Sequence, residues 1–266
     1  MGKALQVVTG QVSDPSTTVT ALTANTGDSF TVQNATQGSD IRLLNAWAFS
    51  ATAGILRIRS PKMHDTTQNM RLQDVASLPF PLLAMEEFQQ LYSQDPITVE
   101  MTGDASAVDL ASLLVWYDDL PGISGNLHSW SEILPLISKL TTVEVDLTSS
   151  ATSCNYSAQV ALNADFDTLQ RDEYYALLGY TCGVSGGTLG FTGNFSGNLR
   201  IGGPLVNQPL WTANWFVRLA QASGKPTIPV FAAADVAAIF VDCAAQAAST
   251  SFKIGCNLAM LKQPLS

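Results

Sequence analysis

The 266 residues are enough for one large domain or for two domains of about 130 residues each. Charged residues make up 13% of the chain, against roughly 25% in an average soluble protein. The formal net charge is −9 and no run of Lys or Arg occurs, which argues against direct, extensive contact with nucleic acid.

The first half of the chain predicts a β-domain. Apolar or alternating runs rich in Val, Ile, Thr and aromatic residues are typical of strands, and clusters of Gly, Asp and Ser between them indicate turns. A Pro-flanked segment at 79–81 precedes a short helical pattern at 82–91. The predicted strands are 29–33, 41–49, 56–58, 97–101 and 111–117.

A turn cluster at 121–125 and a short helical pattern indicate a connector in the middle of the chain. Apolar residues recur at helical spacing from Trp130 to Leu140, but Pro135 interrupts them, so we expect a short or kinked helix. The predicted boundaries are 1–122 for the first domain, 123–140 for the connector and 141–266 for the second domain.

The second half repeats the order of elements in the first. The segment 197–204 matches 54–61 at five of eight positions, sharing Gly, Leu-Arg-Ile and Pro. A strand-like run precedes each segment, at 41–49 in the first copy and at 174–182 in the second. A Pro-flanked segment, a short helical pattern and two strands follow each segment. In the second copy these later elements are the pattern at 231–238 and the strands 239–243 and 257–261. The sequence therefore predicts a tandem duplication.

The Gly-rich stretch 183–197 is interpreted as a longer loop of the second copy, and its first part, 183–190, as a hairpin or a flexible loop. Many short strands, separated by turns, are typical of sandwiches and barrels. We therefore predict an all-β protein of two tandem eight-stranded jelly-roll β-sandwiches, each with a short inserted helix.

No group of residues predicts catalysis, a cofactor or a metal site. His64 stands in a polar loop without a Gly-x-Ser-x-Gly motif elsewhere, and His128 is expected to be exposed or to cap the connector helix. The Gly-rich stretch lacks the Lys of a phosphate-binding loop. We expect buried free thiols, with one disulfide as the alternative, at Cys154, Cys182, Cys243 and Cys256.

Two fused β-domains, each with a helix before its penultimate strand, resemble the double jelly-roll major capsid proteins of tailless icosahedral DNA viruses. The resemblance implies a homotrimer that acts as a pseudo-hexagonal tile of the virion. It also implies contacts with neighbouring capsomers and with minor capsid or vertex proteins, assembly in the host cytoplasm and, as in many members, an internal membrane.

Two large aromatic residues so close in sequence cannot easily share one core, so we expect a subunit contact at Trp211, Trp215 and Phe216. An alternative function is a tandem β-sandwich that binds a receptor or carbohydrate, as a spike or lectin does. Its candidate sites are the stretch 183–197 and the region of Asp65. A third possibility is an enzyme built on a β-sandwich, although no carboxylate pair is evident.

Overall fold

The computed structural model describes residues 2–52, 54–62, 70–73, 80–81, 90–162, 169 and 172–265. Nearly all regular structure in these ranges is β, as predicted. The strands are β1 (Ala4–Ser13), β2 (Thr20–Ala21), β3 (Thr23–Ala24), β4 (Ile41–Phe49), β5 (Ile55–Arg59), β6 (Met70–Gln73), β7 (Phe80–Pro81), β8 (Thr98–Met101), β9 (Val108–Tyr117), β10 (Leu127–His128), β11 (Ile137–Thr148), β12 (Val160–Ala161), β13 (Tyr174–Cys182), β14 (Gly187–Thr192), β15 (Arg200–Leu205), β16 (Ile228–Ala232), β17 (Phe240–Ala245) and β18 (Ser251–Leu261).

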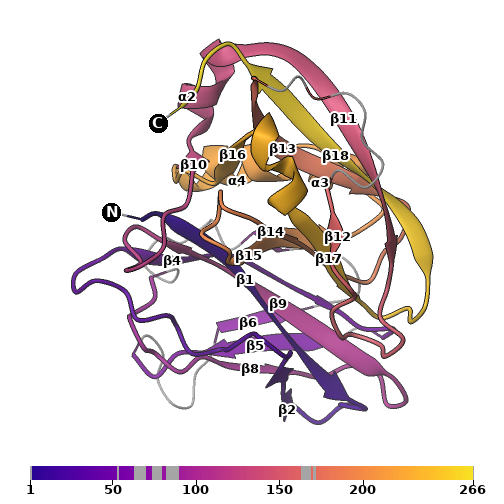
Figure 1. Ribbon diagram of the computed structural model, residues 1–266. Helices are drawn as coiled ribbons and strands as arrows, with labels where there is room; N and C mark the ends of the chain where they lie inside the picture. The colour runs from indigo at the N-terminus through magenta and orange to yellow at the C-terminus, as the bar shows by residue number, and fades with distance from the viewer. Residues whose placement is uncertain are drawn as a thin grey trace.

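The strands form four antiparallel sheets, two in each half of the chain. Sheet 1a has the order β3-β1-β9-β4-β7 and sheet 1b the order β2-β8-β5-β6. Sheet 2a has the order β11-β18-β13-β16-β10 and sheet 2b the order β12-β17-β14-β15. Figure 1 shows them as successive layers, with sheet 1b at the bottom, then sheets 1a and 2b, and sheet 2a at the top.

The two sandwiches share the same order of principal strands. The first long strand of each, β1 or β11, pairs with the last, β9 or β18, which pairs in turn with β4 or β13. The facing sheets also correspond, because β8 and β17 each lie between a short edge strand and β5 or β14. This arrangement is consistent with a double jelly roll, and it confirms the predicted fold class.

The sequence match that first indicated duplication does not join equivalent strands. The segment 54–61 covers β5, whereas 197–204 covers β15, and the topology makes β15 the equivalent of β6. Both segments place Arg beside inward-facing Leu or Ile, because any strand with one buried face alternates in this way. The five shared residues therefore reflect common strand chemistry, while the duplication is evident from the topology.

The interpretation of 183–197 as one flexible loop was wrong, because β14 occupies the middle of this stretch; it forms a hairpin with β15 and also pairs with β17. Glycine fits this strand and its neighbour because the backbones approach closely. A Cβ atom at Gly202 would lie 1.9 Å from the carbonyl oxygen of Leu189, and one at Gly203 would lie 2.4 Å from the hydroxyl of Tyr180. Low side-chain volume, and not flexibility, explains these glycines.

We expect Gly202→Ala to lower the free energy of unfolding by about 1–3 kcal/mol, because the new methyl group overpacks the sheet. Denaturant unfolding followed by circular dichroism measures the change. Gly183→Ala is the matched control, since a Cβ at Gly183 meets no atom within 4 Å. Equal stabilities for the two variants would contradict this explanation of the glycines.

Helices are few and short among the described residues. The connector contains α2 (Trp130–Ile133) and the 3₁₀ helix η1 (Leu134–Leu136), and a capping box of Ser129 and Glu132 begins α2. The helical pattern ends there, because 137–140 belong to β11. The predicted helix at 231–238 corresponds to the 3₁₀ helix η2 (Ala233–Ala238), whereas the predicted helix at 82–91 lies almost entirely outside the described residues.

Two helices between β15 and β16 were not predicted. They are α3 (Pro209–Thr212) and α4 (Trp215–Ser223). The longer one, α4, buries one face against β13 and β16 and ends at Gly224, whose φ of 66° suits glycine. None of the described helices is long and apolar enough to cross a lipid bilayer.

Candidate functional site

Of the two histidines considered for chemistry, one is buried in the fold and the other lies outside the described residues. His64 and its neighbour Asp65 are outside those ranges. His128 is buried, contrary to expectation, and its Nε2 lies 2.8 Å from Oδ1 of Asn126. Desolvation lowers the pKa of His128.

The four cysteines are buried and unbonded, which confirms the prediction of free thiols. Burial raises the pKa of Cys154 and Cys256 to about 12, so both thiols stay protonated. Within the described ranges, no three His, Cys, Asp or Glu side chains are grouped so that they could hold a metal ion.

The structure separates the three residues proposed for a subunit contact. Trp215 and Phe216 lie inside the chain's own core, with 4% and 0% of their surface exposed, whereas Trp211 is 39% exposed. The two Trp do not share one core, because α3 ends between them and only Trp215 is buried. Trp211 remains on the surface, where its ring lies 5.7 Å from the guanidinium of Arg218.

The main contact within the molecule joins unlike sheets of the two sandwiches. The outer face of sheet 1a packs against the outer face of sheet 2b, and β1 runs beside β15 (Figure 1). Trp47 of β4 meets Trp215 of α4 edge to face, with ring centroids 5.9 Å apart. Sheet 1a is therefore buried on both faces. Its apolar residues that join the core of the second sandwich include Leu5, Val7, Trp47, Phe49, Leu110, Leu114 and Trp116.

A chain of buried hydroxyl groups crosses this contact. Thr9 Oγ1 lies 2.7 Å from Ser112 Oγ, which lies 2.6 Å from Thr188 Oγ1 of the second sandwich. The Nε1–H of Trp47 also donates to Thr188, at 3.0 Å. All these groups are buried and hydrogen-bonded. Sliding one sandwich over the other would leave several of them buried without a hydrogen-bond partner. The network therefore sets the register of the two sandwiches.

A buried ionic cluster around Arg200 lies beside this network. Arg200 of β15 pairs with Asp242 of β17, its Nη2 lying 2.9 Å from Oδ2, and its Nη1 lies 3.2 Å from Oδ1 of Asp28 in the first sandwich. Its guanidinium stacks 3.5 Å from the ring centroid of Tyr156. The backbone N–H of Thr9 and the hydroxyl of Tyr156 both donate to the other Asp28 oxygen.

Burial dominates the electrostatics of this cluster. Desolvation raises the pKa of Asp28, although the Thr9 N–H and the positive charge of Arg200 oppose the rise. Arg200 keeps its charge, because the neighbouring acidic groups outweigh its own desolvation and raise its pKa. The guanidinium of Arg200 thus pairs with two carboxylates, Asp28 of the first sandwich and Asp242 of the second.

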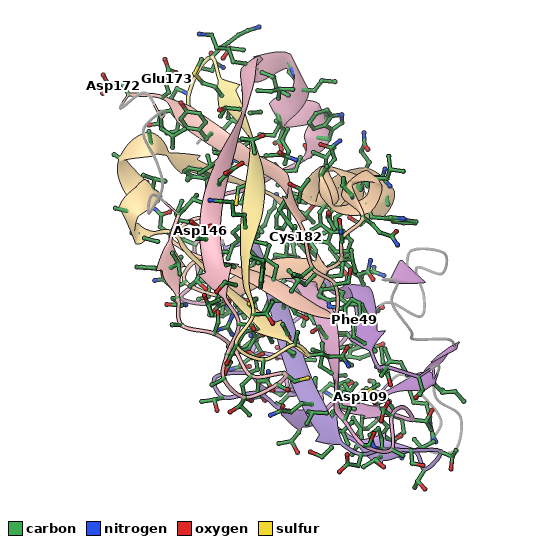
Figure 2. The ribbon with its side chains drawn as sticks, turned by 90° about the vertical axis from the view of Figure 1, so that its right-hand side faces the viewer. Phe49, Asp109, Asp146, Asp172, Glu173 and Cys182 are labelled. Atoms are coloured by element: carbon green, nitrogen blue, oxygen red, sulfur yellow. The ribbon has the colours of Figure 1, made fainter. Side chains whose placement is uncertain are left out.

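Further contacts join the sandwiches around this centre. Lys225 Nζ lies 2.7 Å from Asp40 Oδ2, and Gln246 donates its side-chain N–H groups to the carbonyl of Phe49 and to the carboxylate of Asp109. Phe49 and Asp109 are labelled in Figure 2. The molecule is therefore held by specific polar pairs across a large apolar contact.

In the described part of the chain, no further sheet packs on the outer faces of sheets 1b and 2a, at the two ends of the stack of layers (Figure 1). The outer face of sheet 1b carries Arg57 and Arg59 of β5 with Glu100 of β8, and we name these three residues the arginine face. Leu56 and Ile58 alternate with the arginines and are buried. Glu100 lies 3.5 Å from Arg57 Nε and 2.9 Å from Arg59 Nη2.

The outer face of sheet 2a carries two acids and one lysine. Glu144 and Asp146 of β11 lie beside Lys253 of β18, at 3.7 and 2.9 Å from its Nζ, and we name these three the acidic face. Figure 2 shows Asp146 on the long strand β11. Val143, Val145 and Leu147 alternate with the exposed acids and point into the second sandwich.

The centre of the Gly-rich stretch proposed as a recognition loop is the strand β14 of sheet 2b, so only 183–186 and 193–197 of the stretch lie outside that strand. The sequence did not reveal the two faces either, since it indicates alternation but not which strands become neighbours. One signal was present in β11, where the acids alternate with Val and Leu from 143 to 147.

Three solved structures are similar to the chain at low identity. The PBSX exported protein XepA is 10% identical with a TM-score of 0.28, and the match covers 97% of this chain and 86% of XepA. The major capsid protein P2 from bacteriophage PM2 is 8% identical with a TM-score of 0.25, and the match covers 97% of both chains. The STIV MCP is 10% identical with a TM-score of 0.21, and the match covers 96% of this chain and 97% of that one. No protein-family model and no curated protein matches the chain. The functional proposal below therefore rests on the chain's own geometry.

Proposed function

We propose that the chain is a major capsid protein whose homotrimers act as pseudo-hexagonal tiles of an icosahedral virus shell. The observation that carries the proposal is the contact between unlike sheets, in which sheet 1a meets sheet 2b. Such a contact is heterologous: among the described residues, it leaves sheet 1b at one end and sheet 2a at the other without a partner sheet.

A heterologous contact that repeats either closes into a ring or continues as a filament. Each chain brings two sandwiches of one topology, so three chains supply six similar units around one axis. A turn of about 60° from each sandwich to the next closes the ring. A three-chain particle with six similar edges can fill a hexagonal position in a closed lattice, which is the geometric demand on a shell tile.

The composition supports the same use. With 13% charged residues, the chain relies little on charge for its solubility, which suits a surface that neighbouring subunits largely cover. Net charge −9 suits a shell whose contact with the genome is indirect. In this proposal the tile contacts neighbouring tiles and minor or vertex proteins, resides in the virion, assembles in the host cytoplasm and has no catalytic role. An internal membrane is compatible with it.

We expect native mass spectrometry of the purified full-length chain to give a mass of three subunits, each of 28.3 kDa. Sedimentation velocity over a range of concentrations should give the same trimer in solution. A monomer at every concentration, or an even-numbered closed oligomer, would contradict the proposed tile.

A further inference from the structure

We propose that Leu210 and Trp211 of α3 form an apolar anchor that docks on the first sandwich of the next copy of the chain. This inference rests on the proposed function, because it names a contact that joins the chains of the homotrimer. The occupant is a second copy of this chain. Three features support this choice: the exposure of the two side chains, the position of α3 beside sheet 2a, and the presence of one such helix in each chain.

The two side chains of the anchor are adjacent and both are exposed. Leu210 is 83% exposed and Trp211 is 39% exposed. Among the exposed large hydrophobic residues of the described chain, no other two are neighbours in sequence. Isolated exposed apolar side chains are common on protein surfaces, whereas a contiguous pair that includes a tryptophan is typical of a protein–protein contact.

The anchor is held rigidly, which reduces the entropy that docking would cost. Thr212, the next residue of α3, is fully buried. The helix lies against β13, where a Cβ atom at Gly179 would come within 2.4 Å of the carbonyl oxygen of Thr212. The guanidinium of Arg218 on α4 also lies 5.7 Å from the ring centroid of Trp211. The tryptophan ring is therefore positioned before any partner arrives.

α3 is tied to the outer face of sheet 2a. The Nδ2–H of Asn257 on β18 donates to the carbonyl of Ala213, directly after α3, at 2.9 Å. Asn257 is on the outer face, because its neighbours Cys256 and Leu258 are buried in the second sandwich. Its Oδ1 accepts a hydrogen bond of 3.0 Å from Thr142, an exposed residue of β11, the strand that carries both acids of the acidic face. A subunit that covers this face therefore meets α3 as well.

The ring of the proposed tile places a first sandwich on this face. Within one chain, sheet 1a meets sheet 2b, so sheet 1b is the face that the next copy offers to sheet 2a. The segment that contains α3 and α4 already takes part in the contact inside the chain, because Trp215 of α4 meets Trp47 of sheet 1a. In this proposal the same segment contacts the first sandwiches of two copies, its own through Trp215 and the next through the anchor.

The number of anchors matches three-fold symmetry. Residues 206–227 separate β15 from β16 and include both helices. The equivalent strands of the first sandwich, β6 and β7, are separated by residues 74–79, a stretch too short to hold both. A ring of six sandwiches from three chains therefore carries three anchors, one for each boundary between chains.

Two serine substitutions test the anchor in the full-length chain. Sedimentation velocity and native mass spectrometry compare wild type, L210S/W211S and the matched control F240S, whose ring in sheet 2b is 37% exposed. We expect L210S/W211S to weaken trimer association by about tenfold or more, because two apolar side chains lose their burial in the partner. F240S should associate as the wild type does, and circular dichroism shows that each variant is folded.

Photochemical cross-linking identifies the occupant. A benzophenone amino acid replaces Leu210, and unlabelled chains are mixed with isotope-labelled chains so that mass spectrometry separates links between chains from links within one. We expect the links between chains to end in the first sandwich, between β1 and β9.

The contrary outcomes are distinct. Links between chains that end only in the second sandwich, or an L210S/W211S trimer as tight as the wild type, would overturn the anchor and leave the tile standing. If L210S/W211S kept its trimer but no longer floated with phosphatidylglycerol vesicles that the wild type binds, the occupant would be a lipid surface, which also overturns the anchor. A wild type that stays monomeric would overturn both the anchor and the tile.

Discussion

Replacing Arg200 with Met is expected to lower the free energy of unfolding by about 3–5 kcal/mol at neutral pH. The side chains of Asp28 and Asp242 are only 3% and 2% exposed, so removal of the guanidinium leaves two carboxylates buried without their cation. The neutral variant R200M/D28N/D242N should regain most of the loss, because no uncompensated charge remains. Denaturant unfolding of the three proteins measures both changes.

The pH dependence provides an independent check on this cluster. The pKa of Asp28 is already raised in the folded protein, and loss of Arg200 would raise it further. The folded variant then binds a proton more tightly than its unfolded chain, so its stability relative to wild type improves as the pH falls through the raised pKa. The loss of unfolding free energy in R200M, relative to wild type, should therefore be largest at neutral and alkaline pH and smaller at acidic pH. A deficit independent of pH would contradict the role given to Asp28.

Trp215→Ala is expected to destabilise the fold by about 3–5 kcal/mol, as is usual for truncating a buried aromatic side chain. The substitution empties the space beside Trp47 and removes the hydrogen bond from Trp215 Nε1 to the carbonyl of Gly202, which spans 3.0 Å. The same chemical change at Trp211, on the surface, should cost about 1 kcal/mol or less.

Thermal melting of the two variants separates a core role from a contact role. W215A should melt at a clearly lower temperature than W211A, whatever their oligomeric states. If W215A instead kept the wild-type melting temperature and lost only its self-association, the assignment of Trp215 to the intrachain core would be contradicted.

The strands that could be predicted closely are those with long apolar runs. The boundaries of 41–49 and 174–182 agree with β4 and β13, because both strands are buried on both faces and so read as continuous apolar segments. The first strand, β1, is equally buried but was not predicted. The start of β11 was predicted as part of a helix, because its apolar residues also recur at helical spacing. Short apolar patterns do not distinguish these structures until partner strands are known.

The candidate site could not be predicted because its parts are distant in sequence. Asp28 and Arg200 meet across 172 positions, and each alone reads as an ordinary surface charge. Their burial follows from the packing of sheet 1a on sheet 2b, which no local pattern encodes. By contrast, the low charge content and the duplicated order of elements were evident, and these indicated the architecture.

The packing of unlike sheets between chains is tested most directly by electron cryomicroscopy of the purified oligomer. We predict a three-fold particle of six sandwiches in which sheet 1b of every chain lies against sheet 2a of its neighbour. A particle with two-fold symmetry, in which a sheet meets its own copy, would contradict the account.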